Sequence, residues 1–169
     1  MTIAFETIME EYSGVLSRVA NTYEANAAIQ QELFQEICVA IWQALNRYKG
    51  DANIKTYILK IAHNRCISHV SKEVTQFMSH GDEDAAQLID STLQSTQFDA
   101  EKVFIQSQQV HQLLSHIRDL PMPNRQIISL SLEGLSYEEI ADITGLKTNH
   151  VGVAINRIKQ QLRGAITHE

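Results

Sequence analysis

The sequence of 169 residues has little of several features that mark particular classes of protein. It contains 2 cysteines, too few for a secreted disulfide scaffold, so we expect free thiols in a reducing compartment. Its longest strongly apolar run, from Ile37 to Trp42, is far shorter than the ~20 residues of a membrane helix. The segment from Met1 to Glu6 lacks the basic start and apolar core of a signal peptide. We therefore expect a soluble, cytoplasmic protein without membrane insertion.

The motifs of common enzyme classes are also missing. The sequence has no phosphate-binding glycine loop, no G-x-S-x-G and no H-E-x-x-H, so we expect neither an enzyme nor a cofactor. His63, Cys66 and His69 do recur every three residues, with Cys38 available as a fourth zinc ligand. A polar helix face with one small buried thiol explains this pattern without zinc, and we predict no metal site.

Positive charge is scarce, with 14 Lys and Arg against 20 Asp and Glu. This balance alone argues against a nucleic-acid binder, because phosphate binding depends on Lys and Arg. The distribution reverses that impression. Residues 1–72 hold 7 basic and 7 acidic side chains, residues 101–169 hold another 7 and 7, and residues 73–100 hold 6 acidic and no basic ones. Two balanced segments, each with a local basic patch, are therefore separated by an acidic connector.

Apolar residues recur at steps of three and four on both sides of this connector, as in Leu33, Ile37 and Ile41. Such spacing is typical of amphipathic helices, and no segment alternates in the manner of a strand. We predict an all-α fold of two small helical domains, residues 1–72 and 101–169, joined by an acidic flexible linker, residues 73–100. A short helix near residues 85–89 of the linker is also expected.

The second domain has clear helix boundaries. Pro121 and Pro123 separate two helices, Gly134 ends the second of them, and Gly145 ends a third. A capping box, Ser136-Tyr-Glu-Glu139, predicts the start of that short third helix. Thr148 offers an N-cap for a fourth helix, whose apolar positions are Val151, Ile155, Ile158 and Leu162. The order helix, glycine turn, helix predicts a helix-turn-helix.

The outer face of the last helix suits a DNA reader, because Asn pairs with adenine edges, Val contacts thymine methyl groups and cations bind phosphates. An ordinary pair of helices with a basic, solvated face is the alternative. The residues that we expect on this face are Thr148, Asn149, His150, Gly152, Val153, Asn156, Arg157 and Lys159, followed by Arg163.

Several motifs resemble those of one family in the same order along the chain. Leu120-Pro121, Arg125 and the segment from Leu132 to Leu146 resemble the domain of extracytoplasmic-function (ECF) sigma factors that reads the minus thirty-five promoter element. The segment from Glu32 to Trp42 resembles the helix by which these factors dock on RNA polymerase. Tyr48-Lys-Gly and the segment from Thr56 to Arg65 resemble the parts that open and read the minus ten element.

This resemblance implies roles for named residues of the first domain. Glu32, Gln35, Glu36 and Trp42 would bind core RNA polymerase, although without the resemblance Trp42 would be assigned to the core. The tyrosines of the minus ten set would stack on unpaired bases, or would instead lie at the edge of the core. The residues implied for minus ten DNA binding are Tyr48, Lys49, Asn53, Lys55, Tyr57, Lys60, Asn64 and Arg65.

The sequence also departs from the family pattern. Tyr57 stands where Trp is usual, and the segment from Ser68 to Lys72 lacks the usual Asp and arginines. In the recognition helix, Gly152-Val153-Ala154 stands where Lys, Ser and Arg are common. A glycine inside a helix costs up to about 1 kcal/mol and offers DNA no side chain. The departures in the first domain imply a weaker grip on DNA there. The departure in the recognition helix favours a divergent minus thirty-five preference or a weakened dependence on that element.

The sequence therefore predicts an alternative sigma factor that directs core RNA polymerase to promoter DNA and is held inactive by an anti-sigma factor. We expect it to be a monomer when free. Two alternatives stay open at this point. One is a polymerase-binding adaptor without promoter activity, and the other is a helix-turn-helix regulator that binds duplex DNA without polymerase.

Overall fold

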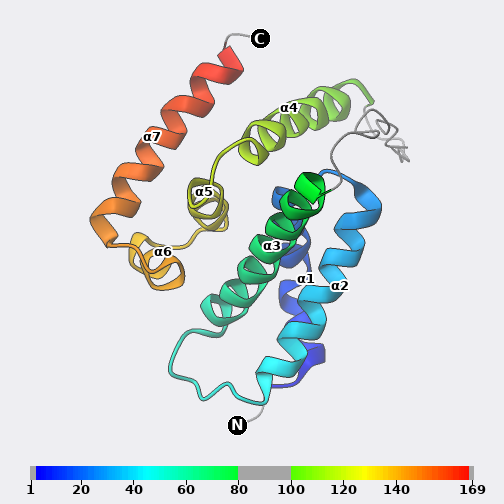
Figure 1. Ribbon diagram of the computed structural model, residues 1–169, viewed down its shortest axis with the longest axis vertical. Helices are drawn as coiled ribbons and strands as arrows, with labels where there is room; N and C mark the ends of the chain where they lie inside the picture. Colours follow the sequence, from blue (N-terminus) through cyan, green and yellow to red (C-terminus); the bar gives the residue numbers. More distant parts are fainter. Residues whose placement is uncertain (1–2, 80–99, 168–169) are drawn as a thin grey trace.

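The computed structural model describes residues 3–79 and 100–167, with side chains for 3–76 and 107–167. Within these ranges the chain forms helices and no strands, which confirms the predicted all-α class. Figure 1 shows two groups of helices, α1 to α3, which precede residues 80–99 in the sequence, and α4 to α7, which follow them. The helices are α1 (Phe5–Tyr23), α2 (Ala27–Leu45), α3 (Ile54–Ser79), α4 (Ala100–Arg118), α5 (Asn124–Leu132), α6 (Tyr137–Thr144) and α7 (Thr148–Thr167).

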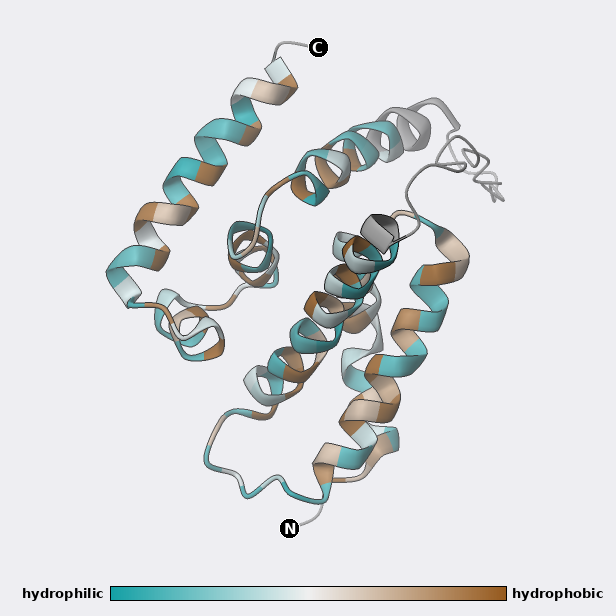
Figure 2. Ribbon diagram, viewed as in Figure 1, coloured by the Kyte–Doolittle hydropathy of each residue, from teal (hydrophilic) through white to brown (hydrophobic). Residues whose placement is uncertain are grey.

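The first group is a three-helix bundle whose helices pack against one another in every pairing. Asn26 starts α2 by accepting hydrogen bonds from the amides of Ala28 and Ile29, which are two of the donors left free at a helix start. The predicted apolar stripe of α2 is buried in the bundle, and the apolar bands of the helices are visible in Figure 2. This packing fixes which face of α2 is left on the outside.

The second group has the boundaries that local sequence chemistry predicts. Ser136 and Glu139 form both hydrogen bonds of the capping box at the start of α6. Gly145 ends α6 with a φ of 78°, in the left-handed region that glycine occupies at little cost. Thr148 differs from the prediction, because it is the first residue of α7 rather than its cap. The amide of Val151 donates instead to the carbonyl of Lys147.

Helix α3 extends past residue 73, the predicted start of the linker. Helix α3 continues to Ser79, so residues 73–79 are helical rather than part of an irregular connector. The side chains of residues 73–76 are exposed, and the polar, acidic composition of residues 73–100 as a whole suggested a linker. Most of the predicted linker, including the short helix expected near residues 85–89, lies outside the described residues.

The two groups of helices contact each other directly. The side chain of Arg18 in α1 makes two hydrogen bonds with the carboxylate of Glu133, at 2.9 and 3.0 Å. Arg118 in α4 donates to the main-chain carbonyl of Asn21 at 3.0 and 2.6 Å. Buried residues of both groups belong to one apolar cluster. The two halves thus share an interface that the sequence analysis did not anticipate.

None of the described helices is both long and apolar enough to cross a membrane.

Candidate polymerase and nucleic-acid interfaces

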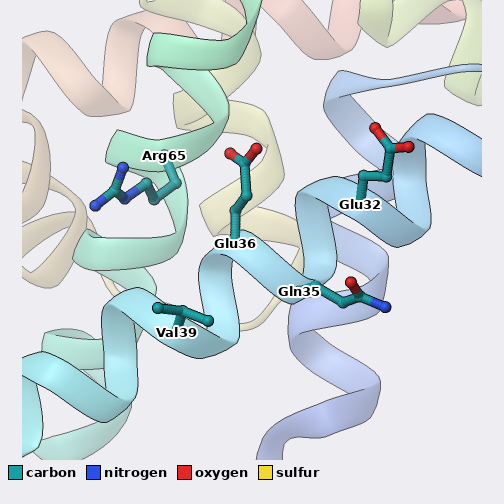
Figure 3. Close-up of a pocket in the computed structure, with 5 residues that line it drawn as sticks. All are labelled: Glu32, Gln35, Glu36, Val39 and Arg65. Atoms are coloured by element: carbon teal, nitrogen blue, oxygen red, sulfur yellow. The ribbon is translucent and has the colours of Figure 1, made fainter.

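The outer face of α2 carries the first predicted set of functional residues. Glu32, Gln35 and Glu36 are all exposed, because the packing of the bundle buries the opposite stripe of the helix. Figure 3 shows them with Val39 along one side of α2, next to Arg65 of the neighbouring α3. These five residues line a shallow open pocket. The structure therefore brings the predicted docking residues together and adds Arg65 to their surface.

Trp42 continues this face toward the end of α2. Its side chain is 57% exposed, so it does not belong to the core. With Phe5, Gln35, Cys38 and Val39 it lines an almost purely apolar hollow. Burial raises the pKa of the half-buried Cys38 thiol, which lies 3.9 Å from the sulfur of Met9. This face of α2 thus combines acidic groups with an exposed aromatic side chain, a pairing suited to a protein partner.

The two tyrosines predicted to hold unpaired bases pack against each other. Their ring centroids are 4.9 Å apart, and both side chains are half-buried. The hydroxyl of Tyr57 donates to the carbonyl of Ala44 at 3.0 Å, and that of Tyr48 donates to the carbonyl of Ala52. The pair therefore ties the loop between α2 and α3 to the bundle.

Two other residues of the minus ten set also have partners inside the protein. The side chain of Asn53 accepts a hydrogen bond from the amide of Lys55 at 2.9 Å and so caps the start of α3. The ammonium of Lys55 donates to the main-chain carbonyl of Glu133 at 3.0 Å, across the interface between the two halves. The interface therefore occupies a residue that was predicted to bind DNA.

The remaining members of the set, Lys49, Lys60, Asn64 and Arg65, are exposed. Asn64 and Arg65 line a polar groove between α2 and α3. The groove also contains Gln43, Arg47 and Ser68, which the sequence analysis missed. Their spacing could have revealed them, because residues four apart on a helix share a face, as Gln43 and Arg47 do on α2 and Asn64 and Ser68 do on α3.

The recognition helix, α7, buries its apolar stripe as predicted and leaves the opposite face outside. Val151, Ile155, Ile158 and Leu162 are buried, and so is Ala154. Gly152 is half-buried, and Val153 is 51% exposed. The other predicted residues of this face are all exposed: Thr148, Asn149, His150, Asn156, Arg157 and Lys159.

Gly152 has a neighbour that the sequence analysis did not consider. A Cβ atom at position 152 would lie 3.2 Å from Cε2 and 3.4 Å from Cδ2 of Tyr137. These distances are shorter than most Cβ contacts in proteins, so the ring of Tyr137 occupies the space next to this glycine. Tyr137 is the first residue of α6 and is 45% exposed. Helix α6 thus supplies an aromatic side chain where α7 has none.

In the part of the chain that the structure describes, the residues considered for zinc do not bring their ligand atoms together. His63 and Cys66 are fully buried, and burial lowers the pKa of His63 to about 3 and raises that of Cys66 to about 12. The Nδ1 atom of His63 is 2.7 Å from the hydroxyl of Tyr23. In the described part of the chain, a different trio, Glu24, His69 and Glu73, has donor atoms within 4.8 Å of one another.

That trio is held together by hydrogen bonds between its own members. The Nε2 atom of His69 lies 2.8 Å from the carboxylate of Glu24 and 3.2 Å from that of Glu73. Burial acts to raise the pKa of Glu24, but hydrogen bonds from His69 and from the amide of Asn26 outweigh it and lower the pKa. The cluster joins the end of α1 to α3.

Comparisons with known proteins agree with this architecture. Residues 8–75 match sigma-70 region 2, and residues 110–162 match sigma-70 region 4. The RNA polymerase sigma factor YlaC of Bacillus subtilis (strain 168) is 25% identical over 142 residues, which cover 81% of this chain and 77% of that protein.

Two solved structures share the fold at low sequence identity. The sigma factor RpoE, in complex with the anti-sigma factor NepR from Bartonella quintana, is 17% identical with a TM-score of 0.72, covering 96% of this chain and 98% of that one. CnrH, in complex with the cytosolic domain of CnrY, is 18% identical with a TM-score of 0.68, covering 98% and 88%.

The two helical groups therefore correspond to the two conserved regions of a sigma factor, in the predicted order. The chain belongs to the sigma-70 family of RNA polymerase sigma factors and is of the ECF type. It is an alternative sigma factor, a protein of promoter-specific transcription initiation.

Proposed function

We propose that the outer face of α2 is the surface by which this sigma factor docks on core RNA polymerase. The proposal is carried by one observation: Glu32, Gln35 and Glu36 are exposed on the same face as Trp42, whose side chain is 57% exposed. An aromatic anchor next to acidic groups fits a partner with an apolar contact and basic side chains. We place the end of the first domain, predicted over residues 1–72, at Ser79, where α3 ends.

The minus ten surface extends along α3 from this docking face. Lys49, Lys60, Asn64 and Arg65 would contact the DNA, with the polar groove between α2 and α3 beside them. Tyr48, Tyr57 and Asn53 would shape the loop. The tyrosine rings would stack on an unpaired base, and the amide of Asn53 would form a hydrogen bond with it. Lys55 would join this surface once its hydrogen bond to Glu133 is broken.

The second domain would read the minus thirty-five element through the outer face of α7. Asn149 and Asn156 are exposed on that face and suit adenine edges. Arg157 and Lys159 suit phosphates, and so would Thr148 and His150 at the start of the helix. Two weak DNA contacts joined in one chain would act together, because linking them raises their effective concentration.

An anti-sigma factor is the proposed regulator of this docking face. The solved relative RpoE is bound to the anti-sigma factor NepR, and its likeness extends over both halves of this chain. A partner that covers Trp42 and its acidic neighbours would block docking on polymerase. We propose that the chain acts without a cofactor and is a monomer in the free state.

Charge reversal tests the docking face. We expect Glu32→Lys and Glu36→Lys together to weaken binding to purified core RNA polymerase by at least tenfold. The matched control is Asp119→Lys, because Asp119 is an exposed acid of the other half. Equal binding by all of these proteins would exclude the α2 face as the docking surface.

Two further sets of substitutions separate the DNA surfaces from docking. Lys60→Ala and Asn64→Ala should reduce transcription while binding to core polymerase is retained. Asn149→Ala and Asn156→Ala should change promoter choice, again with core binding intact. Specific duplex binding by the free chain in a salt-controlled gel shift would instead favour the stand-alone regulator. Unchanged core binding with no transcription from any promoter would favour the adaptor.

A further inference from the structure

We infer that Tyr137 is a further specificity-determining residue of the minus thirty-five interface, and that its ring, seated on Gly152, contacts the methyl group of a thymine. This inference rests on the proposed function of α7. It concerns a residue of α6, outside the recognition helix, and gives a role to the glycine that departs from the family pattern.

The position of the ring follows from the close approach at Gly152. Because residue 152 has no Cβ, Cε2 and Cδ2 of Tyr137 lie 3.2 and 3.4 Å from the place that a Cβ would take. Successive residues of an α-helix are rotated by about 100°, which puts positions 149, 152, 153 and 156 within an arc of about 100°. Gly152 lies at one edge of this arc, so the ring of Tyr137 borders the face that is proposed to enter the groove.

The exposure of the two side chains indicates what this part of the face offers to DNA. Tyr137 is 45% exposed and Val153 is 51% exposed, and both belong to the large apolar side chains left on the surface. An apolar group on a DNA-reading face has one specific partner in the major groove, the C5 methyl of thymine.

The placement of α6 is compatible with such a contact. In a helix-turn-helix the first helix crosses the DNA backbone while the second lies in the groove. Tyr137 is the first residue of that first helix, at the end fixed by the capping box of Ser136 and Glu139. Its backbone is thus firmly placed, and its ring reaches over α7 rather than into the core.

The test replaces thymine by deoxyuridine, which removes the methyl group and keeps every hydrogen-bonding group. Holoenzyme is assembled from core RNA polymerase and the full chain, and a promoter is identified from its run-off transcripts. Each thymine of the minus thirty-five element is then replaced singly, and holoenzyme affinity is measured by competition. We expect at least one replacement to weaken wild-type binding by about fourfold, as for the loss of one buried methyl-sized group.

Four variants identify the side chain responsible. Tyr137→Ala should bind thymine and deoxyuridine equally at that position, whereas Tyr137→Phe, which keeps the ring, should retain the fourfold preference. Gly152→Ala should reduce the preference, because its Cβ displaces the ring. The matched control is Ile166→Ala, since Ile166 is also 45% exposed but lies near the far end of α7. Its thymine preference should equal that of the wild type.

The outcomes separate the inference from the function on which it rests. If wild-type holoenzyme gives no discrete transcripts from any promoter, the proposed function fails and the inference fails with it. If it initiates normally but no thymine preference depends on Tyr137, the inference alone is overturned. The comparison of Tyr137→Ala with Tyr137→Phe does not depend on folding defects, because each protein is judged by the ratio of two affinities.

Discussion

The guanidinium of Arg18 and the carboxylate of Glu133 form a bidentate ion pair, although the two residues are 115 positions apart in the sequence. Glu133 also accepts a hydrogen bond from Lys55 through its main-chain carbonyl. Only 11% of the Glu133 side chain is exposed. This one residue after α5 therefore connects the region 4 half of the protein to two helices of the region 2 half.

Glu133→Lys should loosen the contact between the halves, because it places a third cation next to Arg18 and Lys55. Arg18 is largely exposed, so the pair contributes only about 0.2–1 kcal/mol. We expect the ratio of molecules with separated halves to molecules with contacting halves to rise about fivefold at low salt and less at high salt. Small-angle X-ray scattering checks this through a larger radius of gyration.

Glu138→Lys serves as the control for this substitution, since Glu138 is an exposed acid of the same half with the same charge change. Its scattering profile should match that of the wild type. If Glu133→Lys has the same radius of gyration as the wild type at low salt, the ion pair does not hold the halves together.

Stability should fall below neutral pH because of His63. Burial lowers the pKa of His63 from 6.5 to about 3, so between these values only the unfolded chain takes up this proton. The contribution of His63 to the free energy of unfolding is therefore fully present above pH 6.5 and is lost as the pH falls toward 3. The loss between pH 7 and pH 5 is about 2 kcal/mol. His63→Gln should remove this part of the decline.

Urea unfolding at pH 7 and pH 5 measures the difference directly. His111→Gln is the matched control, because His111 is exposed, and it should decline as the wild type does. An equal decline in His63→Gln and the wild type would assign the pH dependence to other groups.

The capping box of α6 makes a prediction about stability alone. Ser136→Ala leaves the amide of Glu139 without its 3.2 Å partner at the helix start. Loss of such a cap typically costs about 1 kcal/mol, and we expect Tm to fall by about 2–4 °C. Thermal unfolding followed by circular dichroism checks this. An unchanged Tm would mean that solvent satisfies that amide equally well.

Gly152→Ala should stabilise the fold while it disturbs the recognition face. Alanine is favoured over glycine in a helix by up to about 1 kcal/mol, and the half-exposed ring of Tyr137 can move by the few tenths of an ångström required. We expect Tm to rise by up to about 3 °C. A fall of several degrees would show instead that the ring is held rigidly against α7.

Local chemistry made much of the second half predictable. The caps of α6 and the turn at Gly145 depend on residues a few positions apart, and each was visible in the sequence. The buried stripe of α7 follows from its periodicity in the same way, and the outer face is what remains.

Contacts between distant residues could not be predicted in this way. Two examples are the ion pair between Arg18 and Glu133 and the packing of the Tyr137 ring against Gly152. Both depend on how helices pack, which no local pattern encodes. The length of α3 was underestimated because residues 73–100 as a whole are polar and acidic, so the helical residues 73–79 were grouped with the connector. Lys55 was recognised as a surface cation, but its partner in the other half was not.

Run-off transcription tests the central claim most directly. Purified core RNA polymerase is combined with the chain on fragments of its source genome, and the transcript starts are sequenced. The account predicts discrete starts that share two upstream elements at a fixed separation, and their loss when Glu32→Lys and Glu36→Lys are combined. Random starts, or the same starts from polymerase without the chain, would contradict it.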